Sequence, residues 1–158
     1  MISRRAFLAR TTGFAAAGLA GRQLWALGPM APPDTPLVTV YKSSSCQCCA
    51  KWVDHMQASG FKTLVHDREE MDQVKDWLGV PQSVRSCHTA QIDKYLIEGH
   101  VPAEDVRRLL KERPKVAGLA IPGMPQSAPG MDAPGKPHQP YEVVAFQSSG
   151  TTQSFAKH

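Results

Sequence analysis

The chain has 158 residues, with 18 lysines and arginines against 14 acidic residues and a pI near 9.0. The whole basic excess lies before the first acidic residue, Asp34, in Arg4, Arg5, Arg10 and Arg22. Because the charges balance in the remainder, that part lacks the basic excess of nucleic-acid-binding proteins, and we exclude nucleic acid as a partner. Residues 32–158 are enough for one small domain.

The first 31 residues have the layout of an export signal. The paired Arg4 and Arg5 are followed by a mildly apolar stretch of mostly Ala and Gly. That stretch is too short and too weakly apolar to remain as a membrane anchor. Twin arginines with modest hydrophobicity resemble a Tat signal, so we expect export to the periplasm and cleavage within this segment. We therefore predict residues 1–31 as export signal and leader, and residues 32–158 as the folded domain.

The first predicted elements of that domain are a strand and a helix. Residues 37–41 form a β-branched apolar run, which is typical of a strand. The serines at 43–45 offer N-cap hydroxyl groups to a helix expected at 46–59, which Gly60 ends. Helical spacing predicts that its buried face carries Ala50, Val53 and Met56.

Further elements follow in the same alternating manner. The apolar pattern predicts a strand at 61–66, a helix at 71–78 marked by Met71, Val74 and Leu78, strands at 90–93 and 95–98, a helix between Pro102 and Pro114, and terminal strands at 141–146 and 153–155. Residues 122–140 are rich in Pro and Gly and are expected to form a loop. A loop of this length in a small domain is usually functional or disordered.

This order of elements predicts an α/β fold. A strand, a helix and a second strand at the start require parallel pairing through a crossover helix. The whole order is that of a thioredoxin-like sandwich. The expected additions to it are a C-terminal β-hairpin and the Pro/Gly/Met-rich loop.

Three of the four cysteines fall where the first helix begins, at Cys46, Cys48 and Cys49. A helix N-terminus favours thiolate over thiol, because the macrodipole and the unpaired amides stabilise negative charge. Thiolates crowded into one turn repel one another unless a cation joins them, so the cluster favours soft metal ions over a simple redox pair. Structural disulfides are the other expectation for exported cysteines. A Cys46–Cys49 bond with a link to Cys87 is the most that such pairing allows.

Cys87 and His88 form the second part of the predicted site. In a thioredoxin-like layout their segment precedes the third strand and lies beside the cysteine-bearing helix start. Proteins of that fold that exchange disulfides usually carry a proline just before such a threonine, and here His88 precedes Thr89. We therefore predict Cys87 as a metal ligand and His88 as a ligand or the partner of one.

Met124 and Met131 occur in near-identical Pro-Gly-Met settings within the 122–140 loop. Thioethers bind Cu(I) rather than zinc, and they remain neutral donors in an oxidising compartment. Both are predicted ligands, with apolar packing as the alternative. His100 is a candidate imidazole ligand that could equally cap local backbone. The other histidines offer no positional reason to be chosen: His55, His66, His138 and His158.

Together these motifs resemble the DUF411 family, which includes CopG-like copper-resistance proteins. The resemblance covers residues 38–155 and rests on four motifs in order: Cys46-x-Cys48-Cys49-x-x-Trp52, Ser86-Cys87-His88-Thr89, Glu98-Gly99-His100-Val101-Pro102 and the Pro-Gly-Met loop. It implies a thioredoxin-like periplasmic protein that binds copper and assists resistance to it. The metal site that it implies uses Cys46, Cys48, Cys49 and Cys87, joined by His88, His100, Met124 and Met131.

The leading hypothesis is sequestration or redox handling of Cu(I) and Cu(II) in the cell envelope. Cu(I) is the expected bound state, and the site could hold more than one ion because thiolates can bridge metals. Copper ions and periplasmic copper-handling proteins are the expected partners. One alternative is a thiol–disulfide oxidoreductase that cycles Cys46 and Cys49. The other is a zinc-stabilised structural module, which four cysteines would satisfy but in which the methionine loop has no part.

Overall fold

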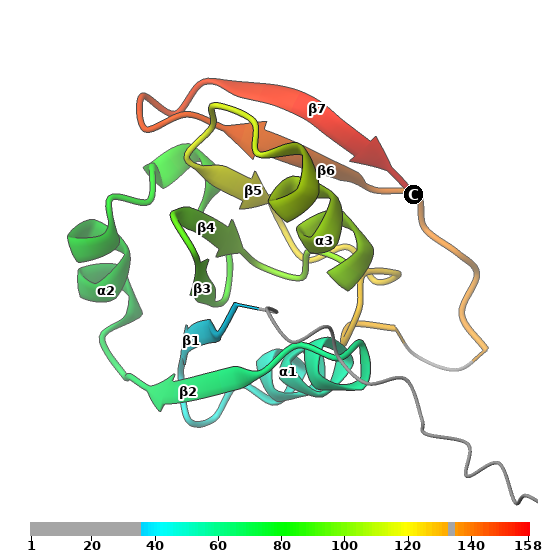
Figure 1. The fold of residues 1–158 in the computed structure, drawn as a ribbon. Coiled ribbons are helices and arrows are strands. Elements are labelled where there is room, and N and C mark those ends of the chain that lie inside the picture. Colours follow the sequence, from blue (N-terminus) through cyan, green and yellow to red (C-terminus); the bar gives the residue numbers. More distant parts are fainter. Residues whose placement is uncertain (1–35, 133–134) are drawn as a thin grey trace, which may run out of the picture.

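The computed structural model describes residues 36–132 and 135–158, and the predicted export signal lies outside them. They form one mixed sheet with the strand order β2-β1-β3-β4-β5-β6-β7 (Figure 1). Its strands are β1 (Val38–Lys42), β2 (Thr63–Asp67), β3 (Thr89–Ile92), β4 (Tyr95–Glu98), β5 (Gly118–Ala120), β6 (Glu142–Phe146) and β7 (Thr152–Lys157). The helices are α1 (Gln47–Ala58), α2 (Met71–Leu78), α3 (Ala103–Glu112) and the short 3-10 helix η1 (Gln82–Val84).

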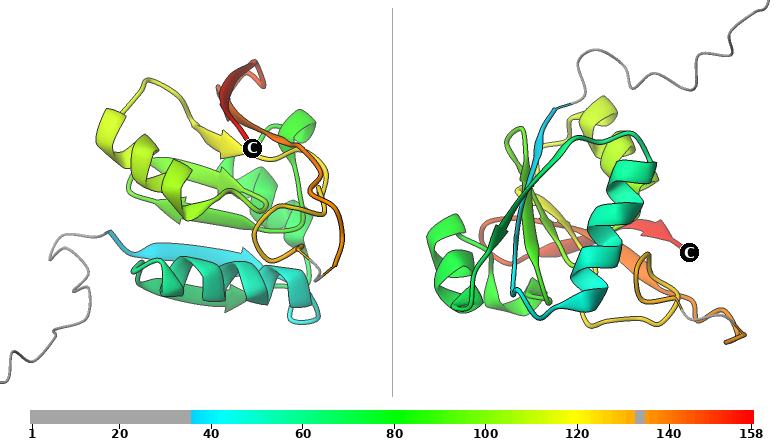
Figure 2. Two further views of the ribbon diagram at one scale, coloured as in Figure 1. Left: turned by 90° about the vertical axis from the view of Figure 1, so that its right-hand side faces the viewer. Right: turned by 90° about the horizontal axis from the view of Figure 1, so that it is seen from below.

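The helices cover the two faces of this sheet unequally. α1 and α3 lie on one face and α2 lies on the other, as the right-hand view of Figure 2 shows. The larger hydrophobic cluster joins the sheet to α1 and α3, and a smaller one around Val84 and Phe146 lies on the α2 side. Within residues 36–132 and 135–158, no helix is long and apolar enough to cross a membrane.

The strand pairing brings three chain segments to one end of the sheet. β1 pairs parallel to β2, as the crossover argument predicts, and antiparallel to β3. β3 in turn pairs antiparallel to β4, with Thr89 opposite Glu98. The end of β1, the start of β3 and the end of β4 therefore meet. These are the points at which the chain reaches Cys46, leaves His88 and continues to His100.

The buried face of α1 differs from the predicted one at three positions. Val53 and Met56 are buried as expected, but Ala50 faces solvent, and Cys49 and Trp52 are buried instead. Trp52 is fully buried, and its indole N–H donates to Val101 O at 2.8 Å. The large indole, rather than the small Ala50, therefore faces the sheet, and this bond satisfies its buried N–H.

α2 is helical where predicted, but the packing of its apolar residues was not anticipated. Met71, Val74 and Leu78 are only partly buried, and the single fully buried residue of the helix is Lys75. The fully buried contact of α2 is therefore made by a charged side chain, while the partly buried Leu78 packs against the smaller hydrophobic cluster.

The C-terminal part of the sheet contains one strand that the sequence pattern did not predict. β5 has only three residues, all buried, and pairs parallel to β4 and antiparallel to β6. β6 and β7 are antiparallel neighbours at the edge of the sheet. The Pro- and Gly-rich segment between β5 and β6 runs back toward the start of α1.

Candidate metal centre

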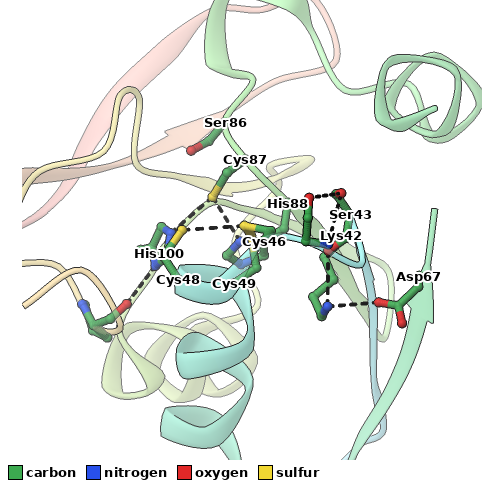
Figure 3. The surroundings of a disulfide bond; sticks show 12 residues. Lys42, Ser43, Cys46, Cys48, Cys49, Asp67, Ser86, Cys87, His88 and His100 are labelled. Carbon is green, nitrogen blue, oxygen red and sulfur yellow. Dashed lines mark hydrogen bonds and ion pairs between the residues drawn. A yellow bond between two sulfur atoms is a disulfide. The ribbon is translucent and has the colours of Figure 1, made fainter. Parts of the chain in front are cut away.

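The cysteines and two of the histidines converge where the three segments meet (Figure 3). One group comprises the sulfur atoms of Cys46, Cys48, Cys49 and Cys87, all within 4.8 Å of one another. A second group comprises Cys87, His88 and His100, within the same limit. Cys87 belongs to both groups, so the two ligand sets form one continuous site.

The first turn of α1 holds both oxidised and reduced sulfur. Cys46, the N-cap residue of the helix, forms a disulfide with Cys49. Cys48 and Cys87 are free thiols, and Cys48 Sγ lies 3.5 Å from Cys46 Sγ. Residues three apart face the same side of a helix, so this pairing follows from the spacing of Cys46 and Cys49. In this oxidised state only Cys48 and Cys87 could ionise to thiolates.

Cys87 is a weakly acidic thiol in the metal-free protein. Burial, together with repulsion from neighbouring Cys48, raises the pKa of Cys87 to about 11. A metal ion reverses this preference, because only the thiolate is a strong ligand and the cation offsets the burial of charge. The site is therefore suited to a cation that displaces protons on entry.

His100 is oriented as a ligand would be. Its Nδ1–H donates to Pro129 O at 2.7 Å, which leaves the lone pair of Nε2 free, 3.1 Å from Cys87 Sγ. Burial lowers the pKa of His100, so its ring is held in the neutral form that binds metals. A carbonyl that fixes the outer nitrogen is a common arrangement for metal-binding histidines.

His88 is the most enclosed member of the group. It is fully buried, its Nδ1 lies 3.3 Å from Cys87 Sγ, and its ring packs on Trp52 with centroids 4.5 Å apart. Among the described residues, its Nε2 is the one buried side-chain nitrogen or oxygen without a hydrogen-bond partner. Burial, with smaller effects from His100 and two lysines, holds the pKa of His88 well below its usual value. A neutral buried imidazole beside a thiol fits a soft metal ion.

The Pro-Gly-Met loop reaches the site through its backbone. Besides the carbonyl of Pro129, Gly130 packs so closely on α1 that an added Cβ would lie 2.9 Å from Cys48 O. Met131 follows directly in the chain and is partly buried, whereas Met124 is 55% exposed. The loop thus lies over the start of α1, and the role of either thioether as a ligand stays a prediction.

A buried polar network behind the site was missed from the sequence. Glu98 accepts hydrogen bonds from Lys75 Nζ, Ser86 N and Thr89 Oγ1, all at the base of the Cys87 segment. Glu98 was noticed only as part of a motif, although a carboxylate within the apolar 95–98 run was a signal of its own. Lys75 gave no such signal, because a lysine on a short helix is ordinarily expected to face solvent.

The family comparison agrees with this arrangement. Two solved structures, titled "Copper resistance protein copG- Form 1" and "Copper resistance protein copG- Form 2", are each 41% identical to the chain with a TM-score of 0.73. Each alignment covers 79% of this chain and 98% or 99% of the other. The family model described as "Protein of unknown function, DUF411" matches residues 84–131.

The chain belongs to the DUF411 family. The matched DUF411 segment contains Cys87, His88 and His100 but not the cysteines of α1, and the CopG structures extend the likeness over most of the chain. No functionally curated protein sequence matches the chain.

Of the predicted site residues, the structure brings six together: Cys46, Cys48, Cys49, Cys87, His88 and His100. Sulfur and imidazole donors without a carboxylate are a set that suits copper and zinc rather than calcium or magnesium. The DUF411 member described here therefore combines a group of side chains that suits a soft metal ion with a thiol pair that can be oxidised.

Proposed function

We propose that this protein binds copper as Cu(I) in the cell envelope and contributes to copper resistance. The observation that carries the proposal is the convergence of four sulfur atoms and two neutral imidazoles in two adjoining groups that share Cys87. The titles of the two CopG structures, which name copper resistance, support the choice of metal. Sulfur donors favour Cu(I) among the copper states.

The proposed ligands are the four cysteines, His88 and His100, with Met124 and Met131 as additional donors from the loop. Cys87 is common to both ligand groups, and a thiolate can bridge two metals. We therefore infer that more than one ion is held, with Cys87 between them. The α/β core is proposed as a thioredoxin-like frame, with β6 and β7 as its added C-terminal hairpin.

The disulfide supports an extension to redox handling of copper. Two electrons separate the Cys46–Cys49 disulfide from the two thiols. Reduction of two Cu(II) ions by the dithiol would yield the disulfide, two Cu(I) ions and two protons, so atoms and electrons balance. In this proposal the reduced protein is the form that binds Cu(I) with all its cysteines.

Metal analysis of the mature protein from copper-supplemented cells, with free thiols counted on the same sample, tests the proposal. We expect more than one equivalent of copper, and thiols that stay shielded until a Cu(I) chelator is added. Cys46→Ser and Cys49→Ser should each abolish tight copper binding while the fold persists, because serine has nearly the same volume as cysteine and both positions lie at the start of α1. Unchanged copper content in both variants would contradict the assigned site.

A thiol–disulfide oxidoreductase is the second candidate, and the Cys46–Cys49 disulfide at the start of α1 favours it. His88, in place of the usual proline before Thr89, and the third cysteine at Cys48 count against it. Reduction of insulin disulfides by the metal-free protein would support this candidate. A zinc-stabilised module would instead lose its fold on chelation and show no preference for copper.

Export through the Tat route is the proposed path to the cell envelope. The support is the sequence of residues 1–31 alone, where Arg4 and Arg5 form the pair. Replacing both with lysine should leave the full-length protein in the cytoplasm, as fractionation and immunoblotting would show. Normal release of a shortened form by that variant would contradict Tat routing.

A further inference from the structure

Lys75 of α2 and Glu98 of β4 form an ion pair in the interior of the protein, with side chains 3% and 0% exposed. Removing two charges from water is costly, and apolar residues of similar volume often stabilise a fold as well or better. Lys75 is also the one fully buried residue of α2, where an apolar side chain would be the ordinary choice. Stability of the fold is therefore a weak explanation for the pair.

The contacts of the pair enclose the segment that carries Cys87 and His88. Glu98 Oε1 accepts from Ser86 N at 2.6 Å, just before Cys87, and Glu98 Oε2 accepts from Thr89 Oγ1 at 2.6 Å, just after His88. Lys75 Nζ donates to Thr89 Oγ1 at 2.8 Å and also binds Glu98 Oε1. One carboxylate thus fixes both ends of the two-residue segment.

Glu98 also lies two residues before His100 in the chain. Directly after Glu98, Gly99 N donates to His88 O at 3.0 Å. Gly99 has a φ of 74°, and a Cβ there would lie 2.6 Å from Ser86 Oγ, so no other residue fits without movement. The backbone that carries His100 is therefore held tightly against the backbone that carries Cys87 and His88.

We propose that Lys75 and Glu98 are positioning residues of the metal centre, which hold Cys87, His88 and His100 at the mutual distances that copper requires. This inference rests on the proposed function. Neither side chain contacts the ion in this account. Their effect is to keep three ligands from separating when the metal is absent, so that binding does not have to order them.

The double variant Lys75→Met/Glu98→Leu tests the inference, because it removes both charges and keeps their volume. We expect its thermal unfolding midpoint to fall no more than that of the core variant Leu109→Ala, because losing the ion pair itself costs little while Ser86 N and Thr89 Oγ1 lose their acceptor. Its Cu(I) affinity, measured by competition with a chromogenic Cu(I) chelator under reducing conditions, should fall by about 10- to 100-fold. Glu98→Gln keeps the shape and one oxygen but leaves Lys75 without its counter-charge, so this second variant should weaken Cu(I) binding in the same direction and also lower the unfolding midpoint.

Leu109→Ala is the matched control. It removes core packing from α3 without touching the Cys87 segment, so it should lower the unfolding midpoint and leave Cu(I) affinity unchanged while the protein stays folded. Equal loss of affinity in this control would assign the effect to general stability and overturn the inference.

A readout without metal completes the test. In the Cys48→Ser background with the Cys46–Cys49 disulfide intact, Cys87 is the one free thiol, and its alkylation rate by iodoacetamide reports how firmly its segment is held. The double variant should be alkylated several-fold faster. Wild-type affinity and wild-type alkylation in the double variant would overturn the inference alone, whereas absence of Cu(I) binding by the unaltered protein would overturn the proposed function with it.

Discussion

Gly130 lies against the first turn of α1 with a φ of 83°, and a Cβ there would come within 2.8 Å of Trp52 N. Two separate penalties therefore apply to a side chain at this position. The left-handed backbone costs an L-residue roughly 1–2 kcal/mol. The clash adds a further cost, because its partners are backbone atoms of a helix and cannot rotate away.

Gly130→Ala should accordingly lift the loop from α1. We expect its free energy of unfolding to fall by at least about 1 kcal/mol more than that of Gly123→Ala, since overpacking typically costs 1–3 kcal/mol. Gly123 is the matched control, because it has a φ of 77° but no atom near its would-be Cβ. Urea unfolding measures the difference, and alkylation of Cys48 should be faster only in Gly130→Ala. Equal behaviour of the two variants would show that the loop does not depend on this contact.

At the scale of single residues, the sequence predicted the clustered cysteines and histidines better than the groups that hold them in position. Cys46, Cys48 and Cys49 lie within one helical turn, so their proximity required no tertiary information. Cys87 and His88 were placed near them by the expected strand order, whereas His100 was added to the ligand set through the family resemblance. The carbonyl of Pro129 and the side chain of Lys75 could not be predicted, because any residue has a carbonyl and a lysine is usually solvent-exposed.

The N-terminus of α3 depends on a side chain from another helix. Pro102, its N-cap residue, makes no side-chain hydrogen bond, and Ala103 N instead donates to His55 Nε2 of α1 at 3.1 Å. Only the neutral ring can accept this bond. Burial lowers the pKa of His55, against the opposing charges of Glu104 and Asp132, with a smaller lowering from Arg107.

Stability linked to His55 should therefore be lost in acid. The unfolded chain takes up a proton near the ordinary histidine pKa of about 6.5, whereas the folded protein resists it until the pH falls through its lower pKa. His55→Gln replaces the ring with an acceptor that does not titrate. We expect stability close to wild type at neutral pH and a shallower decline toward pH about 5, measured by urea unfolding of the metal-free protein.

His55→Ala provides the comparison for this experiment. It removes the acceptor altogether and should cost about 1 kcal/mol at neutral pH, the usual net value of a neutral hydrogen bond. His88 and His100 titrate in every variant, so differences between variants isolate His55. Identical pH slopes in wild type and His55→Gln would show that the ring does not cap α3.

Elements with a clear repeat of apolar residues along the sequence were predicted well, and those without such a repeat were not. The β-branched run at 37–41 and the stop at Gly60 led to β1 and the end of α1 within a residue or two, but the expected serine cap was wrong, since Cys46 is the N-cap residue and makes no side-chain cap hydrogen bond. β5 was missed because Gly118–Ala120 is too short to show alternation, and its burial comes only from the neighbours β4 and β6. The orientation of α1 was wrong at Ala50 because periodicity alone does not choose between a small and a large apolar residue.

For the molecule as a whole, copper binding should appear as added stability. A ligand that binds only the folded state stabilises it by RT ln(1 + [L]/Kd), about 2.7 kcal/mol at a hundredfold excess over Kd. Because the Cys46–Cys49 disulfide removes two of the four thiols, we expect Cu(I) to raise the unfolding midpoint more after reduction than before it. Calorimetry with and without a Cu(I) chelator measures this.

The Cys46→Ser/Cys49→Ser double variant is the control for that experiment. The rise in its unfolding midpoint on adding Cu(I) should be small and independent of reductant, because this variant has no disulfide to open. If Cu(I) raises the unfolding midpoint of the wild-type protein equally before and after reduction, the α1 cysteines do not limit binding.

The way in which α2 docks has a kinetic consequence. A helix that buries one lysine and no apolar side chain completely has little to oppose local opening, so its amide hydrogens should exchange with solvent sooner than those of α1. Each opening withdraws Lys75 from Glu98 and frees the Cys87 segment on one side. The frequency with which α2 opens would then limit the rate of metal release, although no predicted ligand lies on that helix.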